Sequence, residues 1–353
     1  TCHFINGERI SSSQTLRNTS PIDGQFLGDF ALGDSSEVDL AVMAARKAFP
    51  SWRDLGPVGR GEKLENLAKL IEENVETLSQ IETLDNGSLL RSHRKGVMPR
   101  AAANIRFFAE WASNDLKHEP FETRGHVNNV SWDPSGVAAL ITPWNAPLML
   151  ATWKIGPALA AGDTVVLKPA EWTPLTASFF ADLTIKAGIP KGVFNVVFGL
   201  GSQAGSALTK HPGISRISFT GSVPTAKKIA KAAAENLTPI SFELGGKSPL
   251  IVLEDADLDL ASTLAVEQYD NAGQVCLSGT RLLVHQKVAE EFTELFIEKA
   301  KKIRQGDPRI DETQIGPQVH VDHFTRIAGF VERAKKEGAN VVLADLDLKK
   351  CKE

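Results

Sequence analysis

The chain has 353 residues, 42% of them hydrophobic and 23% charged, with a formal net charge of −4. This length exceeds one average domain, so two domains are expected. The near balance of 39 basic and 43 acidic residues gives no indication of a nucleic-acid or membrane-surface partner. The most apolar region, residues 136–167, is interrupted by proline and charged residues, so no transmembrane span is expected.

The N-terminal residues show no charged segment followed by an apolar one, so no secretory signal is expected within the printed sequence, although a removed leader is compatible with it. Only three cysteines occur, at Cys2, Cys276 and Cys351. They are too few for a disulfide framework and fit a reducing compartment, so we expect a cytoplasmic location.

The first 135 residues are predicted to form a hairpin, several helices and a connector. Residues 4–10 contain Asn6-Gly7, a sequence typical of a two-residue hairpin turn. A helix is expected to begin at Ser35 or Ser36 as its N-cap, and apolar residues at three- to four-residue spacing predict one long helix over 58–78 and another over 100–111. Residues 118–135 contain few helix signals and are interpreted as strand and connector.

From residue 136 onward, short apolar runs alternate with helical patterns. This alternation predicts a parallel sheet of Rossmann type covered by helices. The expected strands are 137–141, 164–167, 193–198 and 217–219, and the expected helices are 153–161, 175–187, 203–210 and 225–234. A second cycle follows Gly246, with strands at 250–253 and 282–284, helices from 257 and over 288–303, a helix around 324–330 and a strand over 340–343.

Two short stretches carry side chains suited to catalysis. Residues 242–249 place Glu243 before a Gly-Gly pair, where a loop could aim the carboxylate, and residues 271–276 end in Cys276. A thiol can attack an electrophilic carbon, and a nearby carboxylate can activate the water that cleaves the covalent product. Each stretch also has an ordinary interpretation, because a single cysteine is often a small buried hydrophobic residue and a Gly-Gly pair often marks a turn.

Two other stretches are candidates for binding a dinucleotide. Residues 199–205 follow a strand and open a helix, but they match the glycine-rich fingerprint only loosely, so a plain turn is an equal alternative. Lys168 and Glu171 follow a predicted buried strand, at the end where such sheets bind ligands. A carboxylate there can accept hydrogen bonds from ribose hydroxyls and would repel a 2′-phosphate, which favours NAD over NADP, whereas the alternative is a solvated ion pair.

Five ordered stretches, at residues 141–145, 168–171, 219–222, 242–249 and 271–276, together resemble the NAD(P)-dependent aldehyde dehydrogenase superfamily. The resemblance covers residues 4–343. It implies an α/β fold with a Rossmann-like parallel-sheet cofactor domain, a second α/β catalytic domain and a bridging β arm. The implied division is residues 1–117 and 136–246 for NAD binding, 118–135 for the oligomer-forming arm and 247–353 for an incomplete catalytic domain.

The resemblance also implies a role for each site residue. Cys276 would attack an aldehyde, Asn145 and the Cys276 backbone N–H would stabilise the oxyanion, and Glu243 would act as general base for the thiol and for thioester hydrolysis. No metal is implied, and the oligomer would be a homodimer or homotetramer. The implied cofactor-binding residues are Ile141, Thr142, Pro143, Trp144, Lys168, Glu171, Gly201, Gly205, Phe219, Gly221, Ser222 and Leu244. Lys154, Gln274 and Trp153 are weaker candidates for lining a substrate channel.

The resemblance fails after residue 343, where the superfamily continues with an acidic residue that holds the nicotinamide ribose and with a tail that completes the bridging domain. An inactive NAD-binding or interaction chain of the same fold is therefore an alternative to an active enzyme. A cysteine hydrolase is a third reading, but no histidine occurs in a recognisable motif. Stretches at 99–101, 107–110 and 151–154 are similar to dehydrogenases of muconic-semialdehyde type, while betaine aldehyde and general aliphatic aldehydes remain alternative substrates.

Overall fold

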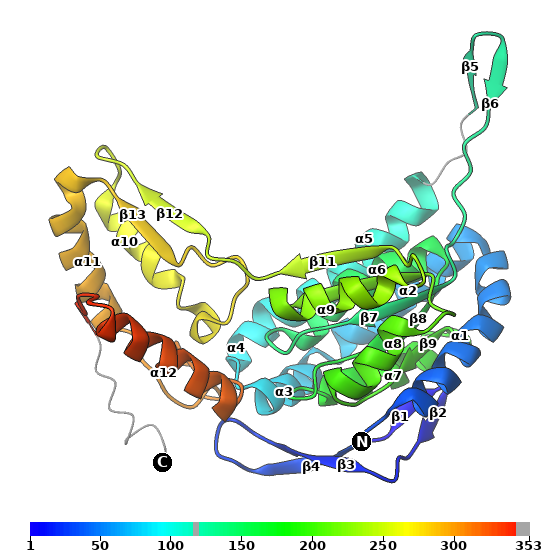
Figure 1. Ribbon diagram of the computed structural model, residues 1–353, viewed down its shortest axis with the longest axis horizontal. Coiled ribbons are helices and arrows are strands. Elements are labelled where there is room, and N and C mark those ends of the chain that lie inside the picture. Colours follow the sequence, from blue (N-terminus) through cyan, green and yellow to red (C-terminus); the bar gives the residue numbers. More distant parts are fainter. Residues whose placement is uncertain (116–119, 344–353) are drawn as a thin grey trace.

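The computed structural model describes residues 1–115 and 120–343, and Figure 1 shows their arrangement. The predictions that concern residues 118–119, Cys351 and the rest of the chain after Leu343 therefore lie outside the described residues.

A seven-stranded mixed sheet in the order β11-β10-β7-β8-β9-β1-β2 forms the centre of the molecule (Figure 1). The first five strands in this order run parallel, whereas β1 and β2 are antiparallel to their neighbours. Their bounds are β1 His3–Ile5, β2 Glu8–Ile10, β7 Val137–Ile141, β8 Thr164–Lys168, β9 Phe194–Val196, β10 Arg216–Gly221 and β11 Ile240–Leu244. The predictions of β7 to β10 are confirmed, but the prediction of a loop at Glu243 is wrong, because Glu243 lies within β11.

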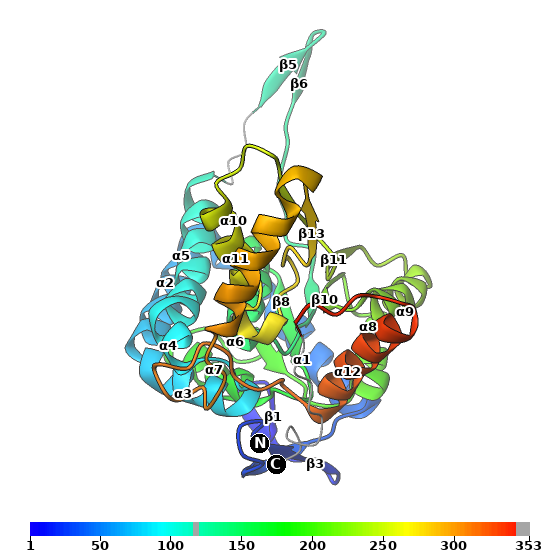
Figure 2. The ribbon, with the colours of Figure 1, turned by 90° about the vertical axis from the view of Figure 1, so that its left-hand side faces the viewer.

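The predicted hairpin of β1 and β2 is confirmed. Asn6 and Gly7 form its turn with φ of 55° and 75°, the left-handed conformation that asparagine and glycine tolerate best. Two further antiparallel hairpins lie outside the main sheet: β3 (Thr15–Thr19) with β4 (Phe26–Ala31), and β5 (Phe121–Thr123) with β6 (His126–Asn128). Figure 2 shows the β5–β6 hairpin projecting away from the body of the molecule, in the segment predicted to be strand and connector.

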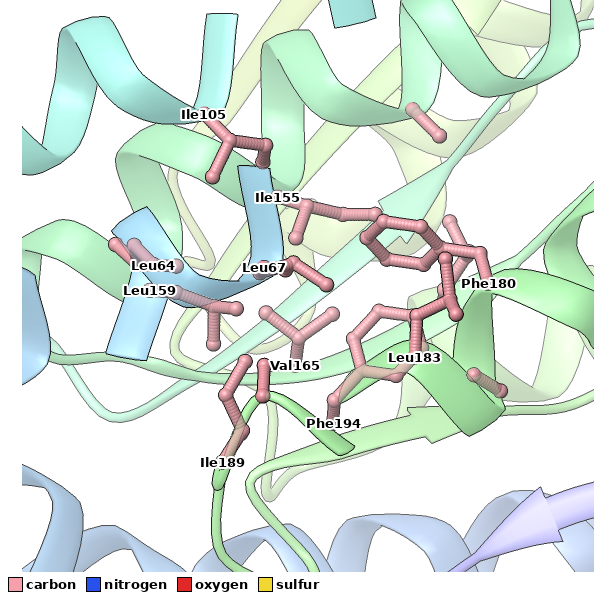
Figure 3. Close-up of a cluster of buried hydrophobic side chains, with 14 of the residues drawn as sticks. Leu64, Leu67, Ile105, Ile155, Leu159, Val165, Phe180, Leu183, Ile189 and Phe194 are labelled. Atoms are coloured by element: carbon pink, nitrogen blue, oxygen red, sulfur yellow. The ribbon is translucent and has the colours of Figure 1, made fainter. Parts of the chain in front are cut away.

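Hydrophobic cores cover both faces of the sheet because side chains on successive strand residues point to opposite faces. Along β7, Ala138 and Leu140 join one core, while Val137, Ala139 and Ile141 join the other. The first core includes residues of α2, α5, α6 and α7 and is drawn in Figure 3; the second includes residues of α1, α8 and α9.

The covering helices match the predicted positions with several differences in their ends. Their bounds are α1 Ser35–Asp54, α2 Gly56–Glu73, α3 Val75–Asn86, α5 Met98–Asp115, α6 Pro147–Ala161, α7 Leu175–Lys186, α8 Ser206–Lys210 and α9 Val223–Ala234. A short helix α4 (Leu90–Ser92) and a π-helical segment η1 (His93–Val97) precede α5, and a π-helical turn η2 (Gly201–Gly205) precedes α8.

Two helix predictions are wrong in detail. The N-cap of α1 is Asp34, whose side chain accepts from Ser36 N while Glu37 accepts from Asp34 N, so a capping box forms one residue earlier than expected. The expected long helix over 58–78 is interrupted at Asn74, which separates α2 from α3. Apolar spacing continues across Asn74, which is why the pattern alone did not show the break.

After β11 the chain forms a second, smaller group of elements, seen on the left of Figure 1. In this group β12 (Pro249–Val252) and β13 (Arg281–Val284) pair in parallel. The other elements of the group are α10 (Leu258–Glu267), the short 3₁₀ segments η3 (Asp270–Gly273) and η4 (Gln286–Val288), α11 (Ala289–Lys301) and α12 (Val321–Lys336). The expected strand over 340–343 is wrong: these residues form no strand and their three apolar side chains are exposed. The division into domains stays a prediction.

Within the described residues, no helix is long and apolar enough to cross a membrane.

Candidate active site

The carboxyl ends of the five parallel strands lie at one edge of the main sheet. From β7 the sheet extends on one side through β8 and then β9, whereas β10 pairs with the other side of β7. Such a reversal leaves a crevice outside the carboxyl ends, where open α/β sheets bind their ligands. The strand register places the predicted residues Ile141, Lys168, Phe219, Gly221 and Leu244 at this edge.

Glu171 lies three residues beyond the end of β8 and is paired with Lys168. Lys168 Nζ is 2.9 Å from Glu171 Oε2, and the Lys168 side chain is almost completely buried. Burial opposes ionisation of Glu171, but the charge of Lys168 and the hydrogen bonds from Lys168 and the backbone together outweigh it, so the pKa of Glu171 lies below its ordinary value. The carboxylate is therefore ionised, and it is also in contact with the backbone of Gly201.

Two glycines in the turns at this edge have different surroundings, and only Gly201 leaves open space beside the backbone. No atom lies within 4 Å of a Cβ placed on Gly201, whereas at Gly221 a Cβ would lie 2.5 Å from the ring of Phe219. Gly221 therefore allows Phe219 to pack beneath the turn. Ser222 then caps α9 by accepting a hydrogen bond from Thr225 N, and Gly205 ends the π-helical turn before α8.

Glu243 lies on the edge strand β11, beside Thr220 of β10, and its side chain is exposed. Its charge acts on Lys154, which is buried and donates from Nζ to Ser218 Oγ at 2.8 Å. Burial lowers the pKa of Lys154 to about 8, against the opposing influence of Glu243. The suggestion that Lys154 lines a substrate channel stays a prediction.

Asn145, four residues beyond the end of β7, is hydrogen-bonded to the cysteine-containing segment. Its Nδ2 donates to Gln274 O at 2.9 Å, and its own backbone oxygen accepts from Asn271 Nδ2 at 3.0 Å. Cys276 follows two residues after Gln274 with an exposed side chain. The structure therefore brings together Asn145 and the Cys276 segment, which are 131 positions apart in the sequence.

Cys276 and Glu243 are not in contact. Within the part of the chain that the structure describes, no hydrogen bond or ion pair joins them, and both side chains are exposed. Of the weaker channel candidates, Gln274 is buried and occupied in hydrogen bonds, while Trp153 on α6 is 39% exposed. Within the same described residues, no group of three or more His, Cys, Asp or Glu side chains could hold a metal ion.

Aromatic side chains near the same edge were not anticipated as a group. The Trp144 ring lies 5.8 Å from Trp172 and 4.7 Å from His323, and Trp172 stacks on His320 at 4.7 Å. His320 and His323 come from the start of α12, so these rings connect the two parts of the chain. The periodicity of α12 predicted a helix but carried no signal of this contact.

The fold and this edge define an α/β protein with a doubly wound parallel sheet and a cysteine-bearing segment at its topological switch point. The sequence signature described as "Aldehyde dehydrogenase family" matches residues 9–352. The chain belongs to the aldehyde dehydrogenase family.

Three similar proteins illustrate the relationship. The 5-carboxymethyl-2-hydroxymuconate semialdehyde dehydrogenase of Escherichia coli is 38% identical over 98% of this chain and 73% of its own length. The human 2-aminomuconic semialdehyde dehydrogenase is 39% identical over 96% of this chain and 70% of its own. The crystal structure of betaine aldehyde dehydrogenase from Staphylococcus aureus in complex with NAD+ has a TM-score of 0.94 and 36% identity, over 98% of this chain and 70% of that one. The chain thus spans about 70% of the length of these relatives.

Proposed function

We propose that the chain oxidises an aldehyde to a carboxylic acid with NAD, through a covalent bond to Cys276. The observation that carries the proposal is the hydrogen bond from Asn145 Nδ2 to Gln274 O, which joins the sheet edge to the Cys276 segment. Supporting it, the ionised Glu171 and the open turn at Gly201 suit a dinucleotide at the switch point. When bound there, NAD would supply the hydride acceptor.

The residues of this chain would then act in sequence. The Cys276 thiolate attacks the aldehyde carbon, a C–S bond forms, and the carbonyl electron pair moves to oxygen. One N–H of Asn145 and the Cys276 backbone N–H stabilise this oxyanion. After loss of hydride from the carbon, Glu243 accepts a proton from water; a C–O bond forms, the C–S bond breaks and the acid is released.

The test is steady-state NADH production by the unsubstituted chain and by Cys276→Ser, with NAD affinity measured in parallel. Turnover should disappear, while NAD affinity should change by less than about tenfold, or ~1.4 kcal/mol, because the thiol contacts the aldehyde rather than the nucleotide. Cys2→Ser is the matched control, since Cys2 is at the opposite end of the chain and only partly exposed. Undiminished turnover in Cys276→Ser, or its loss in Cys2→Ser, would contradict the proposal.

We further propose that the aldehyde carries a carboxylate, as muconic semialdehydes do. Two cavities support this, one of about 520 Å³ that includes Val275 and Leu277 on either side of Cys276, and one of about 910 Å³ beside Met149 of α6. They share Arg91 and Ser92. The smaller is also lined by Glu267 and Asp270, whereas the larger is lined by Lys95 and Arg100 and by no acidic residue. Arg100 Nε donates to Asn104 Oδ1 at 3.2 Å, which orients its guanidinium while leaving its terminal N–H groups for a carboxylate.

Arg100→Met should raise KM for a carboxylated semialdehyde by about 10- to 100-fold, the loss of one charge-assisted hydrogen bond of ~1.5–3 kcal/mol. KM for an uncharged aldehyde of equal length should be little affected. Arg94→Met is the control, because Arg94 pairs with Glu76 at 2.6 Å and lines neither cavity. An equal rise in KM for both aldehydes would show that Arg100 does not bind the substrate carboxylate.

The aldehyde would be the small-molecule partner. A second copy of the chain is the expected protein partner, and the exposed Phe121, Val127 and Trp132 in and after the β5–β6 hairpin support that expectation.

A further inference from the structure

Three side-chain amides form a closed ring of hydrogen bonds between the sheet edge and the cysteine segment. Asn271 Nδ2 donates to Asn145 O at 3.0 Å, Asn145 Nδ2 donates to Gln274 O at 2.9 Å, and Gln274 Nε2 donates to Asn271 O at 2.9 Å. Each amide donates to the backbone of the next residue in the ring. The ring therefore fixes two backbone segments relative to each other as well as three side chains.

The ring spans a backbone turn that is unfavourable for ordinary residues. Asn271, Ala272 and Gly273 have φ of 50°, 58° and 74°, three successive residues in the left-handed region. Only the glycine adopts this conformation freely, and alanine has no side-chain hydrogen bond to compensate. Contacts around the turn must maintain it, and the turn sets the direction in which the chain reaches Cys276.

Three further hydrogen bonds attach the ring and its turn to the rest of the protein. Ser88 Oγ, just after α3, donates to Asn271 Oδ1 at 2.7 Å. Val319 N, just before α12, donates to Gln274 Oε1 at 3.0 Å, and Gln318 Nε2 donates to Ala272 O at 3.0 Å. Both Asn271 and Gln274 thus use their side-chain oxygens for outside anchors and their N–H groups for the ring.

We propose that Asn271 and Gln274 are positioning residues, which hold the Asn145 amide and the Cys276 segment in the relative geometry that oxyanion stabilisation requires. This inference rests on the proposed function. The Asn145 amide has two N–H groups. One is used by Gln274 O, and within the described residues the amide donates no second hydrogen bond. The ring determines where that second N–H points. Donors that already point at the position of the developing oxyanion stabilise the transition state most effectively.

The experiment is a double-mutant cycle on acylation of Cys276 by p-nitrophenyl acetate, measured without NAD as the burst of p-nitrophenolate. The thiolate forms a C–S bond to the acetyl carbon, an oxyanion develops, and the C–O bond to p-nitrophenolate breaks. Asn145→Ala should slow acylation about 100-fold. Asn271→Ala alone should slow acylation about 30-fold. In the Asn145→Ala background the same substitution should slow acylation by less than about threefold, because the amide that Asn271 positions is then absent.

Gln268→Ala is the matched control. Gln268 Oε1 accepts from Gly279 N at 2.6 Å, on the far side of Cys276, so it holds the same segment without joining the ring. The factor by which Gln268→Ala slows acylation should be the same in the unsubstituted chain and in the Asn145→Ala background. Gln274→Ala and Ser88→Ala repeat the cycle if Asn271→Ala does not fold, as judged by thermal unfolding.

The outcomes separate the two proposals. Multiplicative losses for the ring variants, or rates equal to the unsubstituted chain, would overturn the positioning role while leaving Cys276 as nucleophile. If the unsubstituted chain shows no burst, or Cys276→Ser retains it, the proposed function fails and the positioning role fails with it.

Discussion

At the residue scale, the Lys168–Glu171 pair shows how burial and charge together prepare a binding group. Burial alone raises the pKa of a carboxylate, because it disfavours the charged form. The buried ammonium of Lys168 at 2.9 Å keeps Glu171 ionised, with its pKa below the ordinary value. An ionised carboxylate can accept hydrogen bonds from two ribose hydroxyls and repels a phosphate at the same place.

We therefore predict that Glu171→Gln narrows the preference for NAD over NADP by about tenfold, or ~1.4 kcal/mol. The ratio of kcat/KM for the two cofactors measures this directly. Glu235→Gln, at the exposed end of α9, removes the same charge away from the switch point and should leave the ratio unchanged. A ratio that stays constant in Glu171→Gln would place the ribose elsewhere.

At the scale of elements, α3 holds the beginnings of two other helices. Glu82 Oε2 accepts from Leu148 N in the first turn of α6 at 3.0 Å, and Asp85 Oδ2 accepts from Leu175 N, the first residue of α7, at 2.8 Å. Neither α6 nor α7 has a side-chain cap of its own. Both carboxyl groups are fully buried, so α3 supplies from a distance the acceptors that a local N-cap residue ordinarily provides.

Burial also makes these groups sensitive to pH. It raises the pKa of Glu82 to about 8 and of Asp85 to about 7, while it lowers the pKa of His93, 3.8 Å from Glu82, to about 4. Between about pH 7 and 8 the folded chain keeps a proton on Glu82 that the unfolded chain has released, so stability falls as pH rises. His93 is largely neutral in both states in this window and contributes little.

We predict that the free energy of unfolding decreases by up to about 1.4 kcal/mol between about pH 7 and pH 8, and that Glu82→Gln removes most of this decrease. Glutamine keeps an oxygen for Leu148 N but does not titrate. Urea unfolding at the two pH values measures the difference, with the exposed Glu235→Gln as control. A pH dependence that is unchanged by Glu82→Gln would show that another group causes it.

At the scale of the whole molecule, β11 leads from the main sheet to the smaller group of elements, as Figure 1 shows. Beyond that covalent link, the amide ring and the aromatic contacts join the two parts. Helix α12 has no buried residue of its own, so its position depends on contacts at its start, including the stack of His320 on Trp172.

Trp172→Ala should therefore accelerate amide hydrogen exchange in α12 by up to about tenfold, because one aromatic pair contributes ~0.5–1.5 kcal/mol. Exchange in β8, within the buried sheet, should not change. Trp132→Ala is the control, since Trp132 is 64% exposed beyond the β5–β6 hairpin. Unaltered exchange in residues 321–336 would show that other contacts hold α12.

The sequence alone was sufficient for the features that depend on local chemistry. Alternating apolar strands and helices predicted β7 to β10 with their helices, Asn6-Gly7 predicted the first hairpin, and ordered motifs predicted the family. Buried parallel strands and left-handed turns need particular residue types at adjacent positions, so they leave a readable pattern. The roles of Cys276, Glu243 and Asn145 stay predictions that the experiments above address.

Only the tertiary structure decided which distant residues meet. Glu243 continues a strand because β10 pairs with it, and residues 340–343 form no strand although their composition favours one. The acceptors for α6 and α7 come from α3, and Asn271 and Gln274 meet Asn145 through side-chain amides. Hydrogen bonds between residues more than sixty positions apart depend on how elements pack, and no local spacing encodes that.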